Sequence, residues 1–131
     1  MVPCFIIVDD DSINNLICLR IIRKAFPEAD VQIFTDAGAA LSYTRAIFNK
    51  SNASDVILFL DINMPIMTGW EFLESFDFFE TEIKKHVKIY MLSSSIDASD
   101  KERVAGNKNV LDYLEKPLTA ENVKKVLGRL S

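Results

Sequence analysis

Short apolar runs alternate along the chain with longer segments in which apolar residues recur at helical spacing. Several of the short runs are apolar at nearly every position, which is typical of parallel strands covered on both faces. The predicted strands are CFIIVD (4–9), VQIF (31–34), VILFLD (56–61), VKIYML (87–92) and VLDYLE (110–115). The predicted helices are 12–26, 36–50, 68–81, 97–107 and 119–130. Five successive strand–helix units predict an α/β fold, a doubly wound five-stranded parallel sheet with right-handed crossovers.

The predicted helices differ in how well they are anchored. Helix 12–26 has an apolar sector that we expect to face the core, formed by Ile17, Cys18, Ile21, Ile22 and Ala25. Asn14 lies in the middle of this sector, which is an unusual place for an amide unless the first turn projects past the edge of the sheet. Helix 97–107 has Val104 as nearly its only large apolar residue, so we expect it to be the most loosely held.

The composition argues against several classes of protein. A chain of 131 residues with 49% apolar residues has the size of one ordinary domain, and we expect a single domain over 1–131 without a tail. The net charge is −4 and the 15 Lys and Arg residues are scattered, which argues against a nucleic-acid partner. No apolar run approaches ~18 residues and no export signal begins the chain, so we expect a cytoplasmic protein without membrane contact. Cys4 and Cys18 share no metal spacing with a histidine and are interpreted as small core residues.

Acidic residues stand at the ends of two predicted strands. Asp9 and Asp10 end the first strand, Asp61 ends the third, and Lys116 follows the fifth. Ligands of open α/β sheets bind outside the carboxyl ends of the strands. If the first and third strands are neighbours, three carboxylates converge there, and such a cluster stays ionised only with a cation among it. An all-oxygen cluster that is partly open to water suits Mg²⁺.

Each of these residues also has an ordinary structural interpretation. The acidic run from Asp9 to Asp11 precedes a helix, where acidic residues complement the dipole and Ser12 is available as a cap. Asp61 alone fits a turn, Lys116 alone fits a solvated surface lysine, and Ser93 alone fits a loop. Their shared placement at one edge of the sheet favours a site.

Four stretches resemble the receiver domains of two-component response regulators. They are FIIVDDDSINN, LFLDINMPIMTG, IYMLSSS and YLEKPL, in the order and at the spacing of that family, and the resemblance extends from Phe5 to about Leu130. It implies a flavodoxin-like fold with strand order 2-1-3-4-5, like that of the single-domain chemotaxis regulators.

The resemblance also implies roles for individual residues. Asp61 corresponds to the phosphoacceptor, and Lys116 to the lysine that pairs with the acyl phosphate. The implied phosphoryl-binding groups are the Ser93 hydroxyl and the backbone amides of Asn63 and Ser94. The implied Mg²⁺ ligands, with Mn²⁺ as a substitute, are Asp10, Asp61, the backbone carbonyl of Asn63, and Asp9 through water. Ser93 and Tyr113 correspond to the switch residues, and the bond between Lys116 and Pro117 is expected to be cis.

As a receiver domain, the chain would be a signalling phosphoacceptor, with slow autodephosphorylation, rather than an enzyme. The implied donor is a sensor histidine kinase or a histidine phosphotransfer protein. Its candidate contacts are Ile13, Asn14, Ile17 and the segment after Pro117, and the alternative is that the first turn of helix 12–26 is only solvated. The implied output face comprises 97–107, 110–115 and 119–130, and its target is unknown. The sequence leaves open whether the domain works alone or belongs to a longer protein.

Three other classes of protein share part of this pattern. The haloacid-dehalogenase-like phosphatases also use an aspartyl nucleophile after an apolar strand, but they need a second aspartate two residues later, where this chain has Asn63. A nucleotide or flavin binder is disfavoured because no glycine-rich loop follows the first strand. A degenerate receiver that serves only as an interaction module is disfavoured by the intact Asp61, Lys116 and acidic pair.

Overall fold

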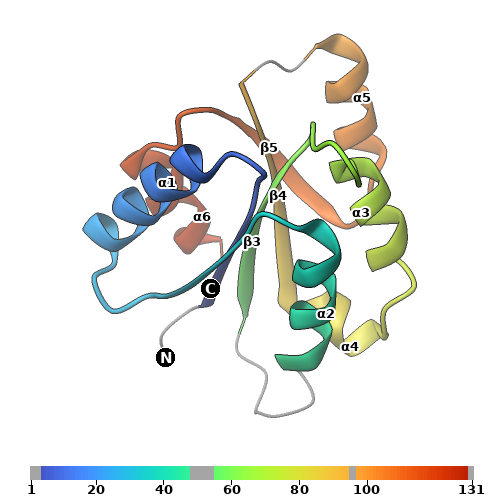
Figure 1. Ribbon diagram of the computed structural model, residues 1–131, viewed down its shortest axis with the longest axis horizontal. Helices are drawn as coiled ribbons and strands as arrows, with labels where there is room; N and C mark the ends of the chain where they lie inside the picture. Colours follow the sequence, from blue (N-terminus) through green and yellow to red (C-terminus); the bar gives the residue numbers. More distant parts are fainter. Residues whose placement is uncertain (1–3, 48–54, 95–96, 130–131) are drawn as a thin grey trace.

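The computed structural model describes residues 4–47, 55–94 and 97–129, which form one sheet with helices on both faces (Figure 1). All strand pairs are parallel, and the order is β2-β1-β3-β4-β5. The strands are β1 (Cys4–Val8), β2 (Asp30–Phe34), β3 (Val56–Asp61), β4 (Val87–Ser93) and β5 (Val110–Glu115). The predicted α/β fold and the strand order implied by the resemblance are therefore confirmed.

The helices form two layers. They are α1 (Ser12–Ala25), α2 (Ala37–Ile47), α3 (Gly69–Phe76), α4 (Thr81–His86), α5 (Ala98–Gly106) and α6 (Ala120–Gly128). Helices α1 and α6 cover one face of the sheet, and the other four lie on the opposite face (Figure 1). Residues 48–50 and 130 of the predicted helices lie outside the described residues. Within the described part of the chain, no helix has the length and hydropathy needed to span a membrane.

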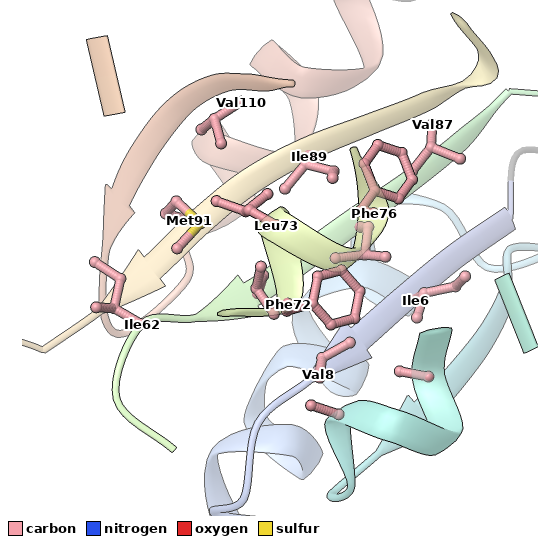
Figure 2. Packing of buried hydrophobic residues seen from close by; sticks show 14 of the residues in the cluster. Ile6, Val8, Ile62, Phe72, Leu73, Phe76, Val87, Ile89, Met91 and Val110 are labelled. Carbon is pink, nitrogen blue, oxygen red and sulfur yellow. The ribbon is translucent and has the colours of Figure 1, made fainter. Parts of the chain in front are cut away.

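The central strands contribute side chains to two separate cores. On β1, Ile6 and Val8 belong to the core under α2 and α3, whereas Phe5 and Ile7 belong to the core under α1 and α6. Figure 2 shows Ile6 and Val8 in the first of these cores, close to the side chains of α3. This burial on both faces explains why β1 and β3 are apolar at almost every position.

The predicted helix over 68–81 is wrong in its extent. Helix α3 ends at Phe76, and a separate short helix, α4, follows at Thr81–His86. The chain turns between them, with Phe79 packed against Phe76 at a ring-centroid distance of 5.3 Å. Only Ile83 of α4 is buried, so the segment has too few apolar positions to produce a helical period.

Helix α5 contributes little to the core. Val104 is the one buried residue among its nine described residues. Two cations of α5 lie over aromatic rings on neighbouring elements: Arg103 over Trp70 of α3 at 4.1 Å, and Lys101 over Tyr113 of β5 at 5.7 Å. Exposed contacts of this kind are worth about 0.5–1 kcal/mol each, so little energy opposes a shift of α5.

Candidate functional site

The carboxyl ends of β1 and β3 bring three aspartates together. Val8 of β1 pairs with Leu60 of β3, so the next residues, Asp9 and Asp61, emerge side by side at the same edge of the sheet. One carboxylate oxygen from each of Asp9, Asp10 and Asp61 lies within 4.8 Å of the others. Asp9 and Asp61 are buried and Asp10 is exposed. The cluster is thus open to solvent on the side of Asp10.

Lys116 reaches this cluster from the end of β5. Its Nζ lies 2.7 Å from Asp9 Oδ2 and 3.5 Å from Asp61 Oδ1. The backbone amide of Lys116 donates to the carbonyl of Ser93 at 2.9 Å, and the bond to Pro117 is cis, as expected from the resemblance. Burial alone would lower the pKa of Lys116, but the hydrogen bond and charges of Asp9 and Asp61 outweigh it and raise that pKa. Lys116 is therefore a firmly charged ammonium between two carboxylates.

The Asp61 carboxyl group has a perturbed pKa. Burial and the nearby charge of Asp9 raise its pKa to about 6, although Lys116 and a hydrogen bond from the Asn63 amide act in the opposite direction. One lysine does not fully compensate three carboxylates at this edge. The donor set is all oxygen and partly open to water, which fits a hard divalent cation such as Mg²⁺.

Asp9 accepts hydrogen bonds from other groups in addition to Lys116. The Asp11 amide donates to its Oδ1 at 2.9 Å, and Asn14 Nδ2 donates to its Oδ2 at 2.8 Å. Asn15 Nδ2 donates to the Asp9 backbone carbonyl at 2.9 Å. Sequence reasoning missed Asn14 as a partner of the Asp9 carboxylate, although an amide within the apolar sector of α1 was the available signal.

The structure corrects three expectations for α1. Asn14 is buried, with 7% of its surface exposed, so it is not available for the donor contact predicted for it. Ile17 is 41% exposed and does not belong to the core face. Asp11, not Ser12, caps the helix, because its carboxylate accepts from the amides of Ile13 and Asn14. Ile13 and Ile17 are both exposed, so the rest of the domain covers the first turns of α1 only in part, which the helical period alone does not show.

The remaining candidate residues lie around this edge. Ser93 is buried at the end of β4, and its neighbour Leu92 pairs with Asp61 of β3. Asn63 and Ser94 are exposed in the loops that follow β3 and β4. Tyr113 is half-buried on β5 and packs against the core under α2 and α3. The structure thus brings Asp9, Asp10, Asp61, Lys116 and the Asn63 amide into one cluster, with the other candidates at the neighbouring strand ends.

Residues 5–128 match the family model of the response regulator receiver domain. The chain belongs to this family. It is 30% identical over 130 residues to hybrid signal transduction histidine kinase I of Dictyostelium discoideum, a match that covers 98% of the chain and 7% of that protein. It is 36% identical over 67 residues to stress response regulator protein 1 of Clavispora lusitaniae, covering 51% of the chain and 32% of that protein. The receiver domain therefore spans well under two thirds of the length of either relative.

Solved receiver domains share the whole fold. A two-component response regulator from Cytophaga hutchinsonii superposes with a TM-score of 0.87 at 27% identity, covering 98% of this chain and 96% of that one. The receiver domain assignment agrees with the predicted phosphoacceptor role in two-component signalling. It leaves no support for the phosphatase alternative, which belongs to a different family.

Gly69 of the receiver domain lies where no side chain fits. A Cβ atom at this position would lie 2.5 Å from the Asp61 carbonyl oxygen and 2.9 Å from Met91 Cε. We predict that Gly69→Ala lowers the free energy of unfolding by about 1–3 kcal/mol, because the backbone at Asp61 has to move to make room for the added methyl group. Gly106→Ala is the control, since a Cβ there meets nothing within 4 Å, and it should be neutral or stabilising. Urea denaturation measures both, and equal effects of the two changes would contradict this packing account.

The raised pKa of Asp61 predicts a pH dependence in the metal-free receiver domain. The ordinary pKa of 3.8 rises to about 6, so the folded state binds the proton more tightly than the unfolded state. Stability is therefore lost as pH rises through this interval. In EDTA at pH 7.5, Asp61→Asn should be more stable than wild type by about 1–2 kcal/mol after allowance for solvent screening, and near pH 4 the gap should close. Urea denaturation of both proteins at the two pH values measures this difference in stability. A difference that does not change with pH would refute the argument that burial raises the pKa of Asp61.

Proposed function

We propose that Asp61 of this single receiver domain, over 1–131, accepts a phosphoryl group from a phosphohistidine of a sensor histidine kinase or a histidine phosphotransfer protein. The observation that carries the proposal is the convergence of Asp9, Asp10 and Asp61 within 4.8 Å, with Lys116 between two of them. A carboxylate at an open strand end, with cationic support on one side, is suited to act as a nucleophile.

In the proposed transfer, an Asp61 carboxylate oxygen bonds to phosphorus while the bond from phosphorus to the donor imidazole breaks. The donor imidazole keeps the electron pair of the broken bond and leaves as a neutral ring, because the other ring nitrogen of the phosphohistidine carries a proton. The second product is an acyl phosphate on Asp61. The Lys116 ammonium pairs with the phosphoryl oxygens, and the Ser93 hydroxyl and the amides of Asn63 and Ser94 donate to them. Phosphoryl transfer depends mainly on positioning and charge stabilisation, which these groups supply.

The acidic cluster is proposed to hold Mg²⁺, with Mn²⁺ as a substitute. Asp10, Asp61 and the Asn63 carbonyl are the proposed direct ligands, and Asp9 acts through water. The exposure of Asp10 and the burial of Asp9 behind its own donors support this division. When bound, Mg²⁺ would offset the charge of the carboxylates and of the incoming phosphoryl oxygens.

The first turns of α1 form the proposed donor-docking surface. Ile13, Leu16 and Ile17 are 69%, 56% and 41% exposed, and they lie directly after the acidic residues at the end of β1. Exposed large apolar residues next to a reactive carboxylate fit a partner that brings its own apolar helix to the site.

A substitution on this surface separates docking from chemistry. We predict that Leu16→Glu slows transfer from a phosphorylated histidine phosphotransfer protein by at least about tenfold, because a charge replaces an apolar contact. Labelling by acetyl phosphate, which needs no docking, should be unchanged. Phe78→Glu is the matched control, since Phe78 is also highly exposed but lies in the turn after α3. Equal slowing with both donors would remove α1 as the docking surface.

Helix α5, strand β5 and helix α6 form the proposed output face. Ser93 would turn its hydroxyl to the phosphoryl group, and Tyr113, half-buried under Lys101, would repack with it. The weak anchoring of α5 supports a shift of this helix, because moving segments come from the least stable parts of a fold. The domain would act as a signalling phosphoacceptor in the cytoplasm, with slow autodephosphorylation, rather than as an enzyme.

The test is phosphorylation of the purified wild-type domain by acetyl phosphate. Intact mass should show one added phosphoryl group with Mg²⁺ present and none with excess EDTA. Hydrogen exchange on the labelled protein should change more in α5 and β5 than in α2. Labelling that is insensitive to EDTA would refute the metal site, and labelling without any change in exchange would refute the switch.

A further inference from the structure

The Asp9 carboxylate has fixed hydrogen-bond donors on both oxygens. Oδ1 accepts from the Asp11 amide at 2.9 Å, and Oδ2 accepts from both Lys116 Nζ at 2.7 Å and Asn14 Nδ2 at 2.8 Å. Of these three donors, the Lys116 ammonium also takes part in the proposed phosphoryl transfer, and the Asp11 amide is a backbone group. Asn14 is the one side chain of α1 that donates to the carboxylate among the described hydrogen bonds.

The position of Asn14 is costly without this bond. The side chain is 7% exposed, and its Nδ2 also lies 3.7 Å from the buried sulfur of Cys18. A buried amide without a partner costs about 1–3 kcal/mol, and an apolar residue would pack against Cys18 without that cost. The bond to Asp9 is therefore the feature that distinguishes Asn14 from an apolar residue at this place.

The neighbouring Asn15 offers a direct comparison. It is also buried, and its Nδ2 donates at 2.9 Å to the backbone carbonyl of Asp9, not to the carboxylate. Its Oδ1 has no hydrogen-bond partner in the described part of the chain. Asn15 therefore fixes the path of the chain as it leaves β1, whereas Asn14 fixes the reactive end of Asp9.

We propose that Asn14 is a positioning residue that orients the Asp9 carboxylate for the metal site. It holds Oδ2 in place when Lys116 leaves Asp9 to pair with the phosphoryl group on Asp61. The shift that Lys116 has to make is small, since its Nζ already lies 3.5 Å from Asp61 Oδ1. This inference rests on the proposed Mg²⁺ site and adds to it a residue that acts through Asp9.

The expected size of the effect follows from other metal sites. Partners that hydrogen-bond to metal-binding side chains typically change metal affinity by about 10- to 100-fold when they are removed. Because Asp9 acts on the metal through water and keeps its Asp11 and Lys116 donors, we expect no more than the lower end of that range for Asn14.

The test compares Asn14→Leu with Asn15→Leu. Isothermal titration with Mg²⁺ should show an affinity about tenfold weaker for Asn14→Leu and within about twofold of wild type for Asn15→Leu. Thermal melting in EDTA reports how much each change destabilises the fold. A purely structural role would lower the melting temperature of both variants and leave their Mg²⁺ affinities alike.

A second variant and a second measurement keep the inference testable if Asn14→Leu does not fold. Asn14→Ala removes the donor without adding bulk and should show the same loss of affinity. In labelling by acetyl phosphate, the Mg²⁺ concentration for half-maximal rate should rise about tenfold, with the rate at saturating Mg²⁺ within about threefold of wild type. If wild type does not bind Mg²⁺, the proposed metal site fails; if wild type binds and the Asn14 variants bind equally well, only the role of Asn14 fails.

Discussion

Replacing Lys116 with methionine is expected to lower the free energy of unfolding by about 3–5 kcal/mol when divalent cations are absent. Lys116 pairs with the buried Asp9 at 2.7 Å, and its side chain is 16% exposed. Removing one partner of a buried ion pair leaves the other charge in a poorly solvated place, which is the cause of the large cost. Asp61, 3.5 Å from the same ammonium, loses its support as well.

Urea denaturation in EDTA measures this loss, and a repeat with Mg²⁺ identifies its electrostatic origin. A cation that binds only the folded state stabilises it, and the gain should be larger in Lys116→Met than in wild type because the acidic cluster has lost its lysine. Lys108→Met is the control, since Lys108 pairs with Asp77 at 3.6 Å while remaining largely exposed, and such pairs contribute about 0–1 kcal/mol. If the two variants lose similar stability, Lys116 does not compensate the negative charge of the acidic cluster.

Asp61→Asn is expected to abolish labelling by acetyl phosphate, with a loss of at least about 100-fold in rate, because an amide oxygen is a poor nucleophile. Intact mass spectrometry over time measures the rate. Asp11→Asn is the matched control. Asp11 undergoes the same chemical change, but its carboxylate caps α1, and asparagine caps helices about as well as aspartate. The control should therefore fold and accept phosphate like wild type, and labelling of Asp61→Asn at a comparable rate would place the phosphoryl group elsewhere.

The parts of the fold that could be predicted from sequence are those set by burial on both faces of the sheet. The run at 56–61 is apolar because β3 lies between β1 and β4 and its side chains enter both cores. The convergence of Asp9, Asp10 and Asp61 could be predicted only with the strand order that the family resemblance implies, because that order makes β1 and β3 neighbours whose ends lie at one edge.

The features that were missed depend on tertiary contacts that leave little trace in a periodic pattern. Helix α4 buries only Ile83, so its sequence carries too little apolar signal. The apolar sector of helix 12–26 predicts Ile17 in the core, but a helical period does not show which turns of a helix the rest of the domain covers. Asn14 is an amide within that apolar sector, and its partner, Asp9, is apparent only in three dimensions.

The most direct test of the central claim is to map the phosphoryl group to a residue. Borohydride reduces an aspartyl phosphate to homoserine, so the wild-type domain is labelled with acetyl phosphate and Mg²⁺, reduced, digested and sequenced by tandem mass spectrometry. The account predicts homoserine at position 61 and aspartate retained at positions 9, 10 and 11. Homoserine at any of those three positions, or aspartate alone at 61 in protein whose mass shows the phosphoryl group, would contradict it.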